Sequence, residues 1–262
     1  MTDFFDGRAY AQEKEEKLKG LVSSLKKKGI TLKLVSLIIG DDQSSILYQH
    51  LKKKAAERIG AELEIINLKS EAKTETIAQM IRDKNSDKSV HGVMIQLPLP
   101  DNFSKDDRND LIYAIDRNKD VDGLRKDSMF TAPVVRAVFD ALGSQDKSLK
   151  VAVVGAYGFE GKKITGKFKE MGFKNLFEIG RASSGYETLL RQADIVVSTT
   201  GRPSLIKPEM IKKGVVLIDV GSPVGDIAKD CYDKASFVSP VPGGIGPATI
   251  ANLIENMVEG VK

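Results

Sequence analysis

The stretch Lys150-Val151-Ala152-Val153-Val154-Gly155-Ala156-Tyr157-Gly158-Phe159-Glu160-Gly161 decides the fold class. An apolar strand pattern passes directly into a glycine-rich turn, and a helical pattern follows. Such a turn suits a dinucleotide, because glycines let the backbone approach a pyrophosphate and the helix offers it unpaired N–H groups. The glycine spacing is GxxGxxG rather than GxGxxG, so a plain tight turn is the alternative at this point.

Short apolar runs alternate with helical patterns on both sides of this turn. Before it, the pattern predicts strands at 32–39, 63–68 and 90–96 and helices at 8–28, 44–59, 74–84, 106–116 and 133–142. From the turn onward, it predicts strands at 150–154, 175–179, 194–198, 215–219 and 237–238, with helices between the first four. Because this alternation is typical of parallel sheets covered by helices, the sequence predicts two α/β domains.

Composition fits a folded protein that is long enough for two modest domains. The 262 residues are 41% hydrophobic and 29% charged, and the 40 basic and 36 acidic residues are mixed along the chain. The net charge of +4 therefore does not indicate a nucleic-acid partner. No apolar run approaches the roughly 18 residues of a membrane span, and one cysteine, Cys231, without a Cys/His cluster predicts neither disulfide nor zinc site. We expect a cytoplasmic protein without nucleic-acid, membrane or metal partners.

The end of the second strand after the turn bears on the choice of cofactor. An NAD enzyme often places an acid there for the ribose hydroxyls, but here Arg181-Ala182-Ser183-Ser184 follow the strand. A guanidinium with neighbouring hydroxyls suits a 2′-phosphate, which favours NADP. Glu178, two residues early, is an alternative ribose partner that keeps NAD possible, and an exposed loop charge is the alternative for Arg181.

Two later loops follow apolar strands with a glycine-containing turn, Thr199-Thr200-Gly201-Arg202-Pro203 and Asp219-Val220-Gly221-Ser222-Pro223. Loops at the carboxyl ends of parallel strands are where such sheets bind ligands, although ordinary strand-exit turns look the same. The candidate cofactor contacts are Gly155, Ala156, Tyr157, Gly161, Arg181, Ser183, Thr200, Gly201, Gly221 and Ser222.

A candidate catalytic helix follows the first strand of the chain. Ser45, Tyr48 and Lys52 stand at positions i, i+3 and i+7, so they share one helix face. A lysine beside a phenol on a partly buried face can have its pKa lowered, which makes it a usable proton acceptor near neutral pH. Since Lys53 and Lys54 adjoin it, a solvated basic helix is the alternative.

Three loops combine polar residues with proline or glycine, at 95–100, 119–124 and 239–247. The last is too rich in glycine and proline to be an ordinary linker, and it indicates close backbone approach to a flat ligand. His50 and His91 join no catalytic triad that the pattern allows, and we expect surface or structural roles for both.

With these motifs in chain order, the sequence resembles the methylenetetrahydrofolate dehydrogenase/cyclohydrolase family over nearly its whole length. The motifs are Asp6-Gly7-Arg8-Ala9, the Ser45, Tyr48 and Lys52 helix, Gln96-Leu97-Pro98-Leu99-Pro100, Lys119-Asp120-Val121-Asp122-Gly123, Ile218-Asp219-Val220-Gly221 and Pro240-Val241-Pro242-Gly243-Gly244-Ile245-Gly246-Pro247. Any one of them can arise by chance, but six in the family's order are highly specific.

The resemblance implies a folate-binding catalytic domain over 1–132 plus 247–262, with a returning C-terminal helix, and a Rossmann-type NAD(P)-binding domain over 133–246. It also implies an active site in the cleft between the domains and a homodimer. The implied activity is oxidation of 5,10-methylenetetrahydrofolate with NADP, followed by hydrolysis of the methenyl product to 10-formyltetrahydrofolate. Such one-carbon units serve purine, methionine and histidine biosynthesis.

The resemblance also implies roles for individual residues. Lys52 would act as base or water activator, Gln96 would position it, Tyr48 would fix the pocket and Asp122 would pair with donor groups of the pterin. The implied substrate contacts are Ser45, Tyr48, Lys52, Gln96, Leu97, Asp122, Pro240, Pro242, Gly243 and Gly244.

The sequence departs from the family mainly at the cofactor turn. The family pattern Gly-Arg-Ser-x-x-Val-Gly here has Ala156, Tyr157 and Glu160 in place of Arg, Ser and Val, so the NADP assignment rests on Arg181 alone. The other departures are Thr131-Ala132-Pro133 for Cys-Thr-Pro and Pro223 for an asparagine. Two alternatives follow: a cyclohydrolase with weak or NAD-dependent dehydrogenase activity, or a non-catalytic folate- or nucleotide-binding regulator.

Overall fold

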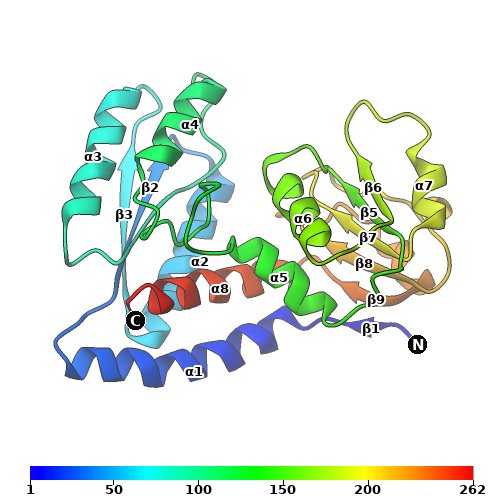
Figure 1. Ribbon diagram of the computed structural model, residues 1–262, viewed down its shortest axis with the longest axis horizontal. Helices are drawn as coiled ribbons and strands as arrows, with labels where there is room; N and C mark the ends of the chain where they lie inside the picture. Colours follow the sequence, from blue (N-terminus) through cyan, green and yellow to red (C-terminus); the bar gives the residue numbers. More distant parts are fainter. Residues whose placement is uncertain (262) are drawn as a thin grey trace. The chain divides into compact units, whose positions relative to one another are not determined.

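The computed structural model describes residues 1–261, which form two compact units (Figure 1). One unit holds a three-stranded sheet and comprises Gln12–Pro133 with the C-terminal residues from Ile250 onward. The other holds a six-stranded sheet and comprises Met1–Ala11 with Val134–Thr249. Lys262, the last residue of the predicted range 247–262, lies outside the described residues.

The sheet of the three-stranded unit is parallel, in the order β3-β2-β4. The central strand β2 is buried along almost its whole length, as its run of valine, leucine and isoleucine requires. The elements of this unit are β2 (Lys33–Ile39), α2 (Gln43–Ile59), β3 (Glu62–Leu68), α3 (Thr74–Ser86), β4 (Gly92–Ile95) and α4 (Lys105–Ala114). The predicted strands and helices of this region are thus present within a few residues of their expected ends.

Both ends of α2 are fixed by local chemistry, and this sets which face of the helix is buried. The carboxylate of Asp42 caps the first turn by accepting the backbone N–H of Ser45 at 2.7 Å. Gly60, with φ of 86°, ends the helix in a left-handed conformation that glycine adopts without strain. Between these ends, the buried residues are Ser45, Gln49, Lys52, Ala55, Ala56 and Ile59.

The core of the three-stranded unit joins its sheet to three helices. Leu34 and Met94 of the sheet share one apolar cluster with residues of α2, with Leu18 of α1 (Gly7–Lys27) and with Ile254 of α8 (Ile245–Glu259). Fully burying an aliphatic side chain of this size contributes about 1.5–3 kcal/mol. Lys14 of α1 also donates to the side chains of α8, so these two helices are joined by polar bonds as well.

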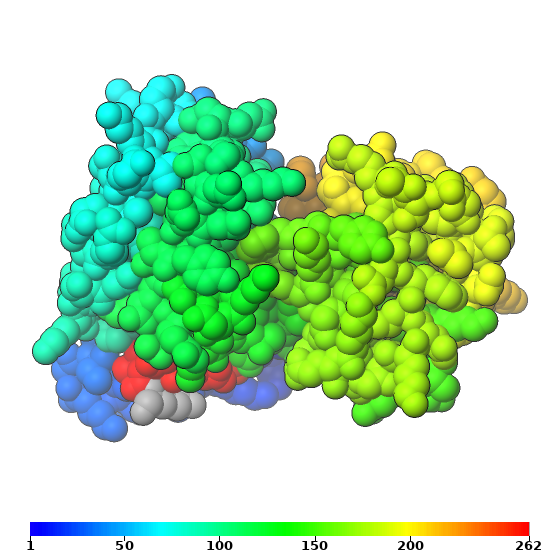
Figure 2. Space-filling view, turned by 45° about the horizontal axis from the view of Figure 1, so that its top comes forward, coloured from blue at the N-terminus to red at the C-terminus, as the bar shows by residue number. Residues whose placement is uncertain are grey.

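Helices α3 and α4 lie side by side at the surface of this unit, cyan and green in Figure 2. The chain enters α4 through a capping box, in which Ser104 and Asp107 satisfy each other's backbone N–H groups. The same Asp107 carboxylate accepts the hydroxyl of Thr74, the first residue of α3, at 2.8 Å. One acid therefore fixes the starts of both helices.

The six-stranded unit contains a fully parallel sheet in the order β1-β9-β8-β7-β5-β6 (Figure 1). Its strands are β1 (Asp3–Phe4), β5 (Val151–Val154), β6 (Leu176–Ile179), β7 (Ile195–Ser198), β8 (Val215–Asp219) and β9 (Ala235–Ser239). Its α-helices are α5 (Pro133–Leu142), α6 (Phe159–Glu170) and α7 (Tyr186–Gln192). The prediction of two α/β domains with parallel sheets is confirmed.

Two details of the six-stranded unit differ from the sequence-based expectation. No α-helix connects β7 to β8: only the 3-10 helix η1 (Pro208–Met210) forms there, because prolines at 203 and 208 interrupt helical hydrogen bonding. At the other edge, β1 pairs with β9, with Asp3 opposite Phe237. The first eleven residues therefore group with this unit, whereas the sequence-based division assigns them to the range 1–132.

Within residues 1–261, no helix is both long and apolar enough to cross a membrane. The same residues hold no group of three or more histidine, cysteine, aspartate or glutamate side chains arranged to bind a metal ion.

Candidate active site

Lys52 lies on the buried face of α2, with only 5% of its surface exposed. Its Nζ donates to Oε1 of Gln96 at 2.9 Å, just beyond the end of β4, and lies 3.8 Å from Sδ of Met94. Helical spacing predicted the shared face with Tyr48, and the fold adds a neutral amide as the lysine's partner. The alternative of a solvated basic helix does not hold for Lys52.

Burial is the main influence on the pKa of Lys52. Loss of hydration lowers the pKa of its amino group, and the charge of Asp122, which acts in the opposite direction, is the smaller influence. A lysine with a lowered pKa is a proton acceptor closer to neutral pH. Asp122 is half-buried, and its negative charge is near enough to Lys52 to favour the protonated amine.

Tyr48 provides a protonated phenol next to Lys52. Burial and the nearby charge of Asp122 raise the pKa of Tyr48 to about 12, so the hydroxyl keeps its proton at neutral pH. The ring centroid lies 5.6 Å from Nζ of Lys52. Tyr48 is therefore suited to donate a hydrogen bond and to pack against a ligand, not to act as a base.

Gln96 joins two residues of α2. Its Oε1 accepts from Lys52 and also from Nε2 of Gln49 at 3.0 Å, while its own Nε2 donates to the carbonyl of Leu97 at 2.6 Å. Gln49 was missed in the sequence, although it stands three residues before Lys52 and four after Ser45, on their helix face. Ser45 itself is buried in the first turn of α2.

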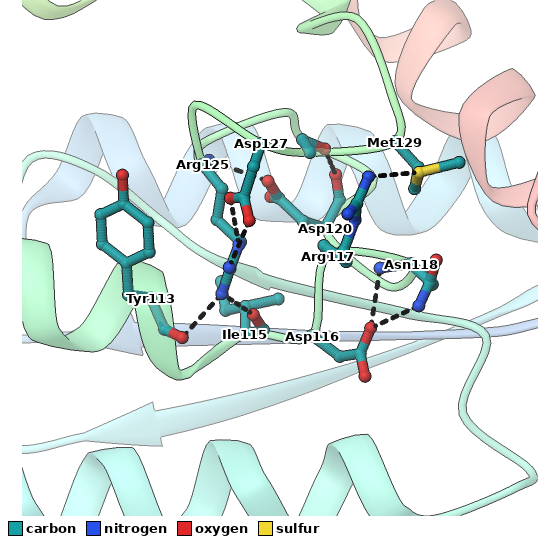
Figure 3. Close-up of polar contacts among 10 residues, drawn as sticks. Tyr113, Ile115, Asp116, Arg117, Asn118, Asp120, Arg125, Asp127 and Met129 are labelled. Carbon is teal, nitrogen blue, oxygen red and sulfur yellow. Dashed lines mark hydrogen bonds and ion pairs between the residues drawn. The ribbon is translucent and has the colours of Figure 1, made fainter.

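The loop that carries Asp122 is held by a buried carboxylate two residues earlier (Figure 3). Asp120 is fully buried and accepts the backbone N–H groups of Leu124 at 3.0 Å and Arg125 at 2.8 Å. Burial raises the pKa of Asp120 to about 6. Gly123, with φ of 59°, completes the turn, since a Cβ at this position would lie 2.7 Å from the backbone of Ala132.

Arg125 ties this loop to the end of α4. Its guanidinium donates to the carbonyls of Tyr113 and Ile115, each at 2.8 Å, and forms an ion pair with Asp127, as the dashed lines in Figure 3 mark. Tyr113 is in the last turn of α4 and Ile115 follows the helix directly, where carbonyls lack intrahelical partners. Asp122 thus projects from a turn that is fixed from both sides.

In the six-stranded unit, the turn between β5 and α6 has the close packing that a phosphate-binding turn needs. Gly155 has φ of 89°, and a Cβ on Gly161 would lie 2.1 Å from the carbonyl oxygen of Gly155. Gly158 caps α6 without any side-chain hydrogen bond. The turn thus fits the phosphates of a dinucleotide, which the first backbone N–H groups of α6 would receive.

The end of β6 presents cationic and hydroxyl groups rather than a free acid. Glu178 forms an ion pair with Lys169 of α6, which argues against the alternative of a ribose partner. Arg181 is exposed, and Ser183 accepts the backbone N–H of Gly180 at 3.0 Å. The ring of Tyr157 lies against Gly180, where a Cβ would meet it at 2.5 Å.

Two buried carboxylates organise the loops after β7 and β8. Asp219 accepts the backbone N–H groups of Gly221 and Asp226, and Asp226 accepts the hydroxyl of Ser198 and the N–H of Thr200 at 2.6 Å. The candidate cofactor contacts Gly201 and Ser222 stand beside these anchors. Asp226 was missed in the sequence because its partners are 26 and 28 residues away.

The glycine-rich loop after β9 packs against the start of the chain within the six-stranded unit. Gly7 donates its backbone N–H to the carbonyl of Gly243 at 2.9 Å, and a Cβ on Gly7 would lie 1.8 Å from the carbonyl oxygen of Gly244. This contact explains the glycine at position 7, and Gly244 has its own reason, since its Cβ would lie 2.3 Å from Oγ of Ser239. Pro240 and Pro242 flank the same turn.

Family models match both parts of the chain. Residues 5–122 match the model of the tetrahydrofolate dehydrogenase/cyclohydrolase catalytic domain, and residues 130–262 match that of its NAD(P)-binding domain. The chain belongs to the tetrahydrofolate dehydrogenase/cyclohydrolase family. The catalytic-domain match includes Tyr48, Lys52, Gln96 and Asp122, and the NAD(P)-binding match includes the turn at Gly155.

Relatives within the family match along almost the full chain. The chain is 35% identical to the bifunctional protein FolD of Lactobacillus acidophilus, with 99% of this chain and 97% of that protein covered. The solved structure of the FolD methylenetetrahydrofolate dehydrogenase/cyclohydrolase of Campylobacter jejuni is similar with a TM-score of 0.90 and 30% identity, covering 99% and 98% of the two chains. The Trypanosoma brucei FolD, solved with NADP and an inhibitor, has a TM-score of 0.90 and 26% identity, covering 99% and 97%.

Proposed function

We propose that this protein oxidises 5,10-methylenetetrahydrofolate with NADP and hydrolyses the resulting methenyl cation to 10-formyltetrahydrofolate. The observation that carries the proposal is the buried Lys52, which is hydrogen-bonded to a neutral amide and whose pKa is lowered. Membership of the family and full-length similarity to bifunctional FolD proteins support both activities.

In the oxidation, the methylene carbon loses a hydrogen with its bonding electron pair, and the substrate becomes a methenyl cation. NADP, held at the Gly155 turn, would supply the acceptor for this hydride. A neutral Lys52 tolerates the developing positive charge, whereas an ammonium group at this place would repel it. The protonated phenol of Tyr48 adds a dipole and an aromatic face without adding charge.

In the hydrolysis, water adds to the methenyl carbon and Lys52 takes the proton that the water loses. The C–OH group then loses its proton and becomes the formyl carbonyl, the bond from this carbon to one ring nitrogen breaks, and that nitrogen takes up a proton. One water is consumed and one proton is released to solvent, so the amine returns to its neutral form. Gln96 holds Nζ of Lys52 in place for this transfer.

Asp122 is proposed to bind the donor groups of the pterin ring. A carboxylate accepts two hydrogen bonds in one plane, which fits a flat heterocycle that carries adjacent N–H groups. The turn anchored by Asp120 and Arg125 holds this carboxylate in position. Ser45, Leu97, Pro240, Pro242, Gly243 and Gly244 remain proposed substrate contacts.

For the cofactor, the proposed contacts are the Gly155 turn for the pyrophosphate and Arg181 with Ser183 for the 2′-phosphate. The pairing of Glu178 with Lys169 supports NADP over NAD. The NADP complex of the Trypanosoma brucei protein adds to this support. On the family resemblance, we further propose a cytoplasmic homodimer that supplies one-carbon units for purine, methionine and histidine synthesis.

A second candidate is a cyclohydrolase with weak or NAD-dependent dehydrogenase activity, favoured by Ala156 and Tyr157 at the cofactor turn. One assay separates the candidates: purified protein with methylenetetrahydrofolate and either NADP or NAD, with reduced cofactor and methenyl absorbance followed together. We expect NADP reduction and then methenyl loss. Hydrolysis without NADP reduction would favour the second candidate, and no turnover of either kind would leave only a binding protein.

A further inference from the structure

Gln49 is a buried amide of α2 that is hydrogen-bonded to Gln96, the partner of Lys52. Its side chain is 1% exposed, and its Nε2 donates to Oε1 of Gln96 at 3.0 Å. The same oxygen accepts Nζ of Lys52 at 2.9 Å. One carbonyl oxygen thus receives donors from two residues of the same helix face.

The orientation of the Gln96 amide follows from its third partner. The carbonyl of Leu97 can only accept, so Nε2 of Gln96 must face it and Oε1 must face α2. Gln49 can then bond to this oxygen only by donating. If the Gln96 amide turned over, its NH2 group would face Lys52 instead and would bind the lone pair that must accept a proton.

If Gln49 had only a structural role, it would lower the stability of the fold compared with an apolar residue. Its Oε1 is buried and has no hydrogen-bond partner within residues 1–261. A buried carbonyl without a partner costs about 1–3 kcal/mol, and an apolar side chain of the same shape would avoid that cost. Stability alone therefore favours a residue such as methionine at this position.

We propose that Gln49 is a positioning residue for the hydrolysis: it keeps the Gln96 amide from turning over and so keeps the lone pair of Lys52 available to water. This inference rests on the proposed function and deepens it, because it assigns the orientation of the Gln96 amide to a further residue of α2. Gln49 acts through Gln96, because it donates to the same amide oxygen that accepts Nζ of Lys52.

The test uses two variants of Gln49 and two matched controls. Gln49→Met keeps length and shape but cannot donate, and Gln49→Glu keeps shape but faces the Gln96 oxygen with acceptors. Gln43→Met and Gln43→Glu make the same changes at an exposed glutamine of the same helix. For each protein, methenyltetrahydrofolate hydrolysis is measured as kcat and KM against pH, together with Tm. The pKa of Lys52 is measured by NMR, with its signal identified from Lys52→Met.

We expect Gln49→Met to lower kcat about tenfold or more with KM unchanged and Tm equal or higher, since misplacing a reacting group by a small distance is costly in rate. We expect Gln49→Glu to raise the Lys52 pKa and to move the acid limb of kcat to higher pH. The Gln43 variants should match the wild type.

Wild-type kcat in Gln49→Met, or parallel losses of kcat and Tm, would overturn the inference. If the wild type itself fails to hydrolyse, the proposed function fails, and an unshifted Lys52 pKa in Gln49→Glu would then overturn the inference separately.

Discussion

Lys52 is bonded through Nζ to the amide oxygen of Gln96 at 2.9 Å, so a buried lysine has a neutral partner in place of a carboxylate. A carboxylate at that distance would stabilise the ammonium form and raise the pKa. The neutral amide holds the amino group in place and leaves burial as the dominant influence on its charge. Position and pKa are thus controlled by different features of the site.

Replacing Gln96 by glutamate should separate these two features. In Gln96→Glu, the carboxylate keeps the contact with Lys52 but raises the pKa of the amino group, so hydrolysis at pH 7 should fall at least tenfold and partly recover at higher pH. The measurement is kcat for hydrolysis between pH 6 and pH 10. An unchanged pH profile would show that the charge of Lys52 does not limit the reaction.

Replacing Lys52 by methionine should stabilise the fold. Because the folded-state pKa of Lys52 lies below its unfolded value, its burial lowers the free energy of unfolding progressively as the pH falls from above the unfolded pKa toward the folded pKa. Lys52→Met should therefore raise Tm, by roughly 2–4 °C for each kcal/mol gained, and its advantage over the wild type should be larger at pH 7 than at pH 10. A variant less stable than the wild type at pH 7 would contradict the burial argument. Lys53→Met, which removes an adjacent exposed lysine, is the control.

Replacing Asp122 by asparagine should weaken folate binding and should allow hydrolysis at lower pH. Loss of the carboxylate should raise KM for the folate about tenfold or more, since a hydrogen bond to a charged group contributes about 1.5–3 kcal/mol. Because the charge of Asp122 raises the pKa of Lys52, its removal should lower that pKa and extend hydrolysis to lower pH. Steady-state kinetics from pH 5 to pH 9 would check both effects. If the acid limb of kcat moved to higher pH, the predicted decrease in the pKa of Lys52 would be wrong.

Replacing Arg181 by alanine should weaken NADP binding selectively. Removing a guanidinium that pairs with a 2′-phosphate should raise the Kd for NADPH about tenfold to a hundredfold and leave that for NADH within about twofold. Fluorescence titration of the reduced cofactors measures both without turnover. Equal effects on both cofactors would remove the basis for assigning NADP. Arg82→Ala, at an exposed arginine of α3, is the control for a general loss of positive charge.

The sequence predicted the elements whose information is local. The apolar run of β2 and the Asp42 and Gly60 boundaries of α2 decide where these elements form, and helical spacing then places Lys52 beside Tyr48. The turn at Gly155 was predicted for the same reason, because glycine spacing directly after a strand is visible within a dozen residues.

Features that depend on distant contacts were not predicted. The pairing of β1 with β9 joins residues more than 230 positions apart, and a two-residue strand has no periodicity to detect. Gln49 was missed for a different reason: Gln96 lies on another element, and only the fold reveals that Gln49 and Lys52 both donate to its Oε1. Glu178 was considered for the ribose because of its place near the end of a strand, and its ion pair with Lys169 could not be predicted because it depends on packing.

The most direct test of the account is the hydrolysis of methenyltetrahydrofolate by Lys52→Met beside the wild type, measured as loss of methenyl absorbance. If the buried amine of Lys52 accepts the proton of the attacking water, the wild type hydrolyses the methenyl compound and the folded variant does so no faster than buffer alone. A folded Lys52→Met protein that hydrolyses at the wild-type rate would show that Lys52 is not the proton acceptor.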